Sequence, residues 1–158
     1  MTLVNDPARR DELERISTTC DELVSGVPTS FHAALQLVQF VRVLGGRGCI
    51  GRFDQWMYPF YRRDIQQGRI TREEAQELLE CLFVKLNHFP GATQADNDTL
   101  RNISLAGQTP DGRDASNELT YMCIEASGKL MLPEPKLNVR FFSDSPSGLM
   151  RACGRVLA

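Results

Sequence analysis

Residues 51–61 read Gly-Arg-Phe-Asp-Gln-Trp-Met-Tyr-Pro-Phe-Tyr, a stretch in which aromatic side chains surround two opposite charges, Arg52 and Asp54. Aromatic side chains favour burial, and charges among them are tolerated only when they are paired or hydrogen-bonded. We therefore expect a structural polar knot where a strand meets a helix. In it, Asp54 caps the following turn and Arg52 holds backbone carbonyl groups. Direct contact of the two charges with a substrate is the alternative.

Pro59 divides this stretch, because proline lacks a backbone N–H and disrupts a regular helix interior. We expect a turn near residues 57–58 and then a short helix that runs to Gln67, with Gly68 at its C-cap. A capping box of the Thr-x-x-Glu type follows at once. It predicts that the next helix covers residues 71–87.

Two helices precede the aromatic stretch. Apolar residues at helical spacing predict the first over residues 6–24. The second is capped by Thr29 or Ser30, and because it is apolar on most sides we expect it to be buried. Glycines end this helix, and a short strand over residues 47–52 leads into the aromatic stretch.

Helices and strands alternate in the second half of the chain. The pattern predicts a loop over 88–100, a strand over 101–107, a turn over 109–113, a helix over 115–130, a strand over 136–142 and a final helix from Ser145. Strands separated by helices favour a parallel or mixed α/β sheet. About three short strands are few for such a sheet. We therefore expect a helix-rich, partial α/β domain that more chain or a partner completes.

The composition is that of an ordinary globular domain: 158 residues, 42% of them hydrophobic and 24% charged, with a net charge of −2. A chain of this length forms one domain. Because there is no basic excess, we expect no nucleic-acid partner, and because no apolar run approaches about 20 residues, we expect no membrane span. The first ten residues do not resemble a secretory signal, which favours a cytoplasmic location.

Five cysteines, at positions 20, 49, 81, 123 and 153, are far apart and form no C-x-x-C pair. This spacing disfavours a zinc ribbon and predicts reduced, mostly buried thiols. His32 and His88 have no evident ligand partners, so we expect no metal and no directly bound cofactor. A small independent enzyme with Cys49 as nucleophile is a weak hypothesis, because no base is placed near that thiol.

Several stretches, in order, resemble the pyruvate formate-lyase-like family of glycyl radical enzymes, and they cover nearly the whole chain. The central one is Gly51-Arg-Phe-Asp-Gln55 followed by Tyr58-Pro-Phe-Tyr61. The others are residues 6–10, 28–36, 68–80, 109–121 and 132–140.

The resemblance implies a large cytoplasmic enzyme of anaerobic metabolism, built on a ten-stranded α/β barrel of two half-barrels, of which this chain is part of one half. It also implies a glycyl radical, installed by a partner activating enzyme that uses S-adenosylmethionine and an iron–sulfur cluster. In the family this radical passes to a cysteine on a loop inside the barrel, and the thiyl radical takes hydrogen from the substrate. The reactions are radical cleavages of C–C, C–O or C–N bonds, by lyases and by transferases of the formate acetyltransferase type.

Two motifs of the family are missing from these residues. The loop of the active cysteine is expected after the last helix, and the sequence reaches Ala158 without it. The glycyl radical loop is absent as well, and none of the five cysteines stands in the context of the active one. We therefore expect residues 1–158 to be the central part of an incomplete domain without a catalytic residue of its own. Its partner would be the rest of the barrel or a full-length homologue.

Four polar residues are candidates for substrate binding in the intact barrel. Arg47 and Cys49 would share one face of the short strand, where Arg47 offers its guanidinium to an anionic group. A solvated loop arginine is the alternative. Asn138 and Arg140 alternate with apolar residues on the last strand and would face the barrel interior, where structural hydrogen bonding explains them equally well.

The sequence thus predicts a fragment of a glycyl radical enzyme that is inactive by itself. A non-catalytic binding or assembly module derived from that barrel is the alternative. In either case we expect the isolated chain to expose apolar surface that the barrel would otherwise cover, and to self-associate.

Overall fold

The computed structural model describes residues 6–44, 49–87 and 102–157. In chain order, the elements are α1 (Pro7–Ser25), α2 (Phe31–Val43), β1 (Gly51–Arg52), α3 (Phe53–Gln66), α4 (Arg72–Asn87), β2 (Ile103–Ala106), α5 (Glu118–Leu130), β3 (Leu137–Arg140) and α6 (Ser147–Leu157). The predicted order of helices and strands is confirmed, and each strand is shorter than its predicted range. The loop predicted over residues 88–100 lies outside the described residues.

The three strands form one parallel sheet in the order β1-β2-β3. Helices connect consecutive strands, which confirms the predicted helix-rich α/β class. Gly51 pairs with Ile103, and Ile103 pairs with Leu137, so one row of residues crosses the whole sheet. Within the described residues no further strand pairs with the outer side of β1 or of β3.

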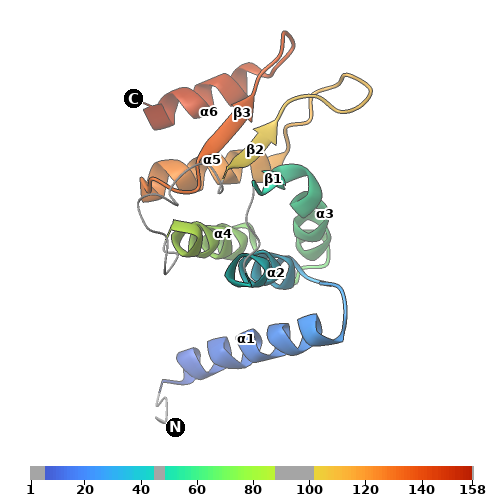
Figure 1. Ribbon diagram of the computed structural model, residues 1–158, viewed down its shortest axis with the longest axis vertical. Coiled ribbons are helices and arrows are strands. Elements are labelled where there is room, and N and C mark those ends of the chain that lie inside the picture. Colours follow the sequence, from blue (N-terminus) through green and yellow to red (C-terminus); the bar gives the residue numbers. More distant parts are fainter. Residues whose placement is uncertain (1–5, 45–48, 88–101, 158) are drawn as a thin grey trace.

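The core lies between the sheet and the helices. Figure 1 shows α1 at the end of the molecule farthest from the sheet, α2 and α4 next to it, then α5 and the strands, with α6 at the opposite end. Buried apolar side chains from α2 to α6 and from β2 form one continuous cluster, which includes Phe31, Met57, Tyr61, Leu79, Phe83, Ile103, Leu105, Leu119, Met122 and Leu149. No helix of the described ranges combines the length and the apolarity needed to span a bilayer.

The turn predicted near residues 57–58 is wrong, because α3 continues unbroken through Pro59. A proline inside a helix loses one backbone hydrogen bond and crowds the preceding turn. Packing offsets this cost: Phe53, Met57 and Tyr61 follow one another at four-residue intervals on one side of α3 and are all buried. Pro59 lies on the exposed side of the helix. Tertiary contacts therefore decided the local structure here.

Several helix ends follow the expected capping chemistry. Gly68, just after α3, has φ of 63° and donates its N–H to a carbonyl of the last turn, as expected of a glycine that ends a helix. Thr71 and Glu74 exchange side-chain-to-backbone hydrogen bonds, which confirms the predicted capping box of α4. A second box, made by Asn117 and Thr120, starts α5 later than predicted.

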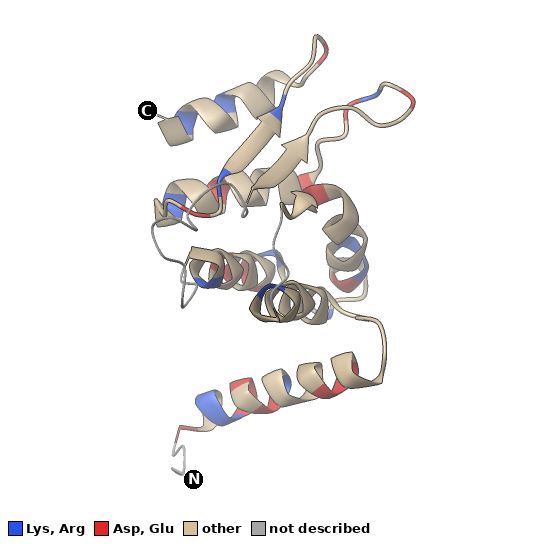
Figure 2. Ribbon diagram, in the orientation of Figure 1, with Lys and Arg blue, Asp and Glu red and all other residues tan. Residues whose placement is uncertain are grey.

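The expectation that α2 is buried on most sides is wrong. Its first turn is buried, but Leu37, Val41 and Val43 of its second half are exposed. Figure 2 shows that α2 is nearly without charged residues, whereas α1 and α4 carry both signs. This side of α2 is apolar, but within the described residues no other element packs against it.

Candidate functional site

The side chain of Arg52 holds the end of the neighbouring strand. Its Nη2 donates hydrogen bonds to the carbonyl oxygens of Ala106, at 3.0 Å, and Gln108, at 3.2 Å. Ala106 is the last residue of β2, and Gln108 lies just beyond it. A guanidinium suits this position because its rigid fork of N–H groups serves two acceptors at once.

Asp54 holds the same strand end through a different group. It lies in the first turn of α3 and is completely buried. Its Oδ2 accepts hydrogen bonds from the backbone N–H of Ala106, at 2.7 Å, and from the Thr120 hydroxyl, at 2.6 Å. The sequence pointed to a cap for the turn that follows Asp54, but both donors come from other elements, β2 and α5.

Gln55 and Asn117 add two more bonds between the same regions. Gln55 Nε2 donates to the carbonyl of Ala115 at 2.7 Å, and Asn117 Nδ2 donates to the backbone carbonyl of Asp54 at 2.9 Å. The Arg-Phe-Asp-Gln run is therefore bonded to one continuous segment, residues 106–120. This segment connects β2 to α5 at the carboxyl end of the sheet.

One face of the sheet is polar. Arg52, Ser104 and Asn138 occupy a single row of paired residues across the three strands, so their side chains lie on the same face. Arg140 stands two residues farther along β3, on that face as well. Asn138 and Arg140 are exposed, and Ser104 is half-buried.

The opposite face of the sheet packs on the core. Ile103 and Leu105 are fully buried, and Leu137 and Val139 lie against the same cluster. Exposure therefore alternates along β3 with the two-residue period of a strand. Parallel sheets are ordinarily covered on both faces. The polar face of this sheet carries exposed side chains and, within the described residues, lacks such a cover on β3.

Cys49 lies away from that polar face. Of residues 49–52, the described part of the strand predicted over 47–52, Gly51 and Arg52 form β1. Arg47 lies outside the described residues. Cys49 precedes the amino end of β1, one edge of the sheet, whereas Arg140 ends β3, the other edge. The structure therefore brings Asn138 and Arg140 together but leaves Cys49 apart from them.

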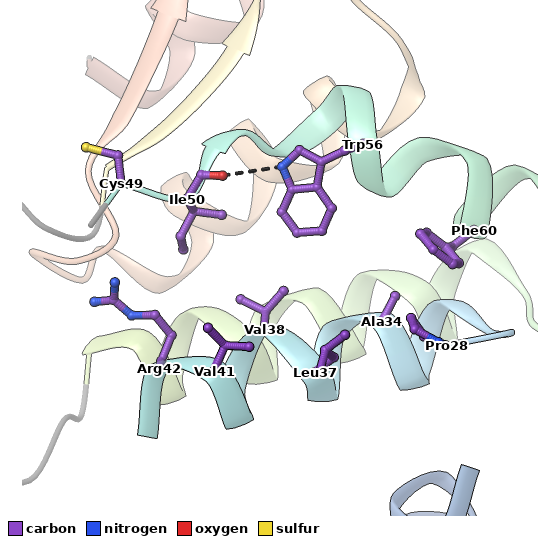
Figure 3. A pocket seen from close by; sticks show the side chains of 10 residues that line it. All are labelled: Pro28, Ala34, Leu37, Val38, Val41, Arg42, Cys49, Ile50, Trp56 and Phe60. Atoms are coloured by element: carbon purple, nitrogen blue, oxygen red, sulfur yellow. Dashed lines mark hydrogen bonds between the residues drawn. The ribbon is translucent and has the colours of Figure 1, made fainter. Parts of the chain in front are cut away.

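Cys49 instead lines an apolar groove of about 410 Å³ between α2 and α3. Figure 3 shows side chains of α2 facing Trp56 and Phe60 of α3 across the groove, with Arg42 and Cys49 at one end. The Trp56 indole donates to the carbonyl of Ile50 at 3.3 Å, so the walls of the groove present mostly carbon. The remaining lining residues are Pro28, Ala34, Leu37, Val38 and Val41. Such a groove suits apolar side chains of another segment.

The prediction of mostly buried thiols is wrong. Cys123 is buried, whereas Cys20 and Cys153 are half-buried and Cys49 and Cys81 are exposed. Burial raises the pKa of the Cys123 thiol well above its ordinary value, and the nearby Asp54 carboxylate acts in the same direction. Cys123 is therefore a protonated, unreactive thiol. Across the described ranges, His, Cys, Asp and Glu side chains do not gather in threes that suit a metal ion.

Sequence reasoning missed the partners of the polar knot. The spacing Asn117-x-x-Thr120 is typical of a helix start. It is the local sequence signal for the two side chains of the 106–120 segment that bond to Asp54. Nothing in the order of residues indicates that Asp54 bonds to Ala106, because the two are brought together by strand pairing.

Comparisons with known proteins find similarity over nearly the whole chain. The model of the family described as pyruvate formate lyase-like matches residues 2–158. Trans-4-hydroxy-L-proline dehydratase from Clostridioides difficile is 35% identical, over 94% of this chain and 21% of its own length.

Two solved structures share the fold. The structure from Roseburia inulinivorans that concerns 1,2-propanediol dehydration matches with a TM-score of 0.87 and 36% identity, over 96% of this chain and 21% of its own. A glycyl radical enzyme from Archaeoglobus fulgidus matches with a TM-score of 0.85 and 30% identity, over 97% of this chain and 22% of its own. The chain therefore spans about a fifth of the length of the relatives it matches.

Proposed function

The chain belongs to the pyruvate formate lyase-like family, and we propose on that premise that it forms part of one half of the barrel of a glycyl radical enzyme. The supporting observation is the agreement in fold with glycyl radical enzymes over almost all of its residues. Residues 1–158 would be the central part of the domain. The whole protein would break a C–O, C–C or C–N bond by radical chemistry, as a lyase or transferase of anaerobic metabolism in the cytoplasm.

The radical itself does not fit the residues of this chain. None of the five cysteines stands in the sequence context of the family's active cysteine, and the 158 residues hold no glycyl radical motif. In the intact protein, a glycyl radical installed by an activating enzyme with S-adenosylmethionine and an iron–sulfur cluster would supply hydrogen abstraction. This chain would contribute a wall of the barrel and part of the substrate pocket.

The polar face of the sheet is the proposed substrate-facing side of that wall. Asn138 and Arg140 project from it with exposed side chains, and Ser104 lies beside Asn138 on β2. A guanidinium binds carboxylate, sulfonate or phosphate groups with two parallel hydrogen bonds. We assign the recognition of an anionic substrate group to Arg140. Arg47 and Cys49 were the other two candidates; Cys49 lines the apolar groove instead, so a substrate contact for either of them stays a prediction.

A chimeric enzyme tests the proposal. The corresponding fifth of the Clostridioides difficile dehydratase is replaced by this chain, and the product is treated with that enzyme's own activating enzyme. We expect a folded chimera that acquires an activator-dependent organic radical signal in electron paramagnetic resonance. A folded chimera that never acquires the signal contradicts the proposal.

Substitutions in an active chimera test the substrate contacts. Arg140→Lys keeps the charge but loses the bidentate fork, so we expect KM to rise about tenfold, the equivalent of ~1.4 kcal/mol, with a smaller change in kcat. Arg155→Lys, in α6 on the helical side of the domain, is the matched control and should change neither constant. An unchanged KM for Arg140→Lys removes this arginine from the pocket, and Arg47→Lys is judged in the same way.

The apolar groove favours a second function, that of a non-catalytic binding or assembly module. Its occupant would be an apolar segment from the rest of the barrel or from a full-length homologue. Coding sequence beside this segment that carries the active-cysteine and glycyl radical motifs supports the enzyme. If those motifs are absent there, and the purified chain is monodisperse and co-elutes with a full-length relative, the module is supported.

A further inference from the structure

Ala106 is held at both of its backbone polar groups by one short block of sequence. Its N–H donates to Asp54 Oδ2, and its carbonyl accepts from Arg52 Nη2. Ala106 has φ of 57°, a left-handed conformation that is disfavoured for a residue with a Cβ. Gly107, which follows, is also left-handed, with φ of 86°. Such a turn persists only where its surroundings hold it.

The side chain of Arg140 lies across this turn. A Cβ placed on Gly107 would stand 3.2 Å from Arg140 Cβ and 3.5 Å from Arg140 Cδ. The glycine therefore leaves the space through which the arginine side chain runs. Because the Arg140 side chain lies this close to Gly107, the turn limits the positions that the side chain can take.

Of the two side chains that hold the turn, Asp54 is the buried one. It is 0% exposed, and the ion pairs among residues 6–44, 49–87 and 102–157 do not include it. Its charge is instead stabilised by two short hydrogen bonds, to Ala106 and Thr120, and by the dipole at the start of α3. Hydrogen bonds to a charged acceptor are stronger than neutral ones. The carboxylate therefore binds the backbone N–H of Ala106 more strongly than the side chain of an asparagine would.

We propose that Asp54 is a positioning residue for Arg140: the buried carboxylate fixes the Ala106–Gly107 turn, and the turn fixes the arginine side chain. The inference rests on the proposed function, in which Arg140 binds an anionic substrate group. A guanidinium held in one place binds such a group without first losing its own conformational freedom.

A second aspartate of α3 provides a matched control. Asp64 is also buried, and its Oδ2 accepts the backbone N–H of Phe31, at the start of α2, at 2.7 Å. Asp54→Asn and Asp64→Asn thus replace a charged acceptor by a neutral, weaker one at opposite ends of one helix. A general loss of stability affects both variants, whereas a local role separates them.

The experiment measures amide hydrogen exchange and the Arg140 Nε–H resonance in the 158-residue chain. In Asp54→Asn we expect the Ala106 amide to exchange at least about tenfold faster relative to the Phe31 amide. In Asp64→Asn we expect the reverse. The Arg140 Nε–H resonance should shift or broaden in Asp54→Asn and stay in place in Asp64→Asn.

Thr120 supplies a milder pair of variants in case Asp54→Asn does not fold. Thr120→Val removes one donor to the carboxylate and should shift or broaden the Arg140 resonance. Thr120→Ser keeps the donor and should leave that resonance as in the wild type. The inference is overturned if Asp54→Asn, or Thr120→Val in its place, leaves the Arg140 resonance unchanged. Equal loosening of both amides by the two aspartate variants overturns it as well. No readout uses a substrate, so failure here is distinct from failure of the KM test on Arg140.

Discussion

At the scale of single residues, Gly107 combines two constraints that substitutions can separate. Both Gly107 and Gly112 have positive φ, but a Cβ on Gly107 would approach Arg140, whereas a Cβ on Gly112 would meet nothing within 4 Å. We expect Gly112→Ala to lower the free energy of unfolding by about 1 kcal/mol, through backbone strain alone. Gly107→Ala should lower it by roughly a further 1 kcal/mol, because the arginine side chain must move. Urea denaturation of both variants measures the difference, and equal losses contradict the Arg140 contact.

His32 gives the chain a predicted dependence on pH. Burial lowers the pKa of His32 below its ordinary value of 6.5, and the charges of Arg15 and Lys85 act in the same direction, while that of Glu22 opposes them. The unfolded chain therefore binds a proton more readily than the folded one. The stability contributed by the neutral ring is present above pH 6.5 and is lost as the pH falls from there through the lower, folded pKa.

The measurement compares wild type with His32→Gln by urea denaturation at pH 7.5 and at pH 5.5. We expect the wild type to lose more of its stability between these two values than the variant does, because glutamine has no proton to gain. The other titratable groups are the same in both proteins and cancel in the comparison. A loss of the same size in the two proteins means that His32 is not the group responsible.

At the scale of elements, α3 ties three parts of the molecule together. Asp54 near its start binds the end of β2, and Asp64 near its end binds the start of α2. Phe53, Met57 and Tyr61 of the same helix face the core and are buried. The helix therefore tolerates a proline in its interior, because contacts along its whole length hold the backbone in place.

The proline inside α3 yields a prediction with the opposite sign from most substitutions. Pro59 is exposed, so Pro59→Ala loses little packing and regains a backbone hydrogen bond. We expect the free energy of unfolding to rise by about 1 kcal/mol, the net worth of one such bond. Pro7→Ala is the control, since a proline at the start of a helix removes no helical bond. Thermal denaturation should show a higher Tm for Pro59→Ala alone, and a lower Tm would mean that Pro59 favours the native helix.

At the scale of the whole molecule, the exposed side of α2 is where the chain is incomplete as a packing unit. Leu37 and Val41 are 37% and 51% exposed and border the apolar groove. Apolar surface gathered in one place promotes association in water. We therefore predict that the isolated chain self-associates through this groove.

Sedimentation velocity at increasing protein concentration tests the prediction. Leu37→Gln combined with Val41→Gln should keep the chain monomeric at concentrations where the wild type forms larger species. Val24→Gln combined with Val27→Gln is the control, because these valines are even more exposed, at 90% and 80%, but do not line the groove. A wild-type chain that stays monomeric, or a control pair that acts like the groove pair, contradicts the prediction.

Much of the architecture is determined by the sequence alone. Helical spacing, the capping box at Thr71 and the alternation along residues 137–140 place most helices and strands in their correct order. These signals are local, because they depend on residues within a turn or two of one another. The order of helices and strands also predicts a parallel or mixed sheet, which the structure shows to be parallel. The motif around Gly51 to Gln55 indicates the family.

The tertiary structure alone decided how that motif is used. Arg52 and Asp54 reach Ala106, more than fifty residues away, and only the pairing of β1 with β2 brings them together. Likewise, the continuity of α3 through Pro59 and the uncovered side of α2 depend on what packs against each helix. A sequence states which residues favour burial or a cap, but the partner of a buried charge is chosen by contacts between segments that are distant along the chain.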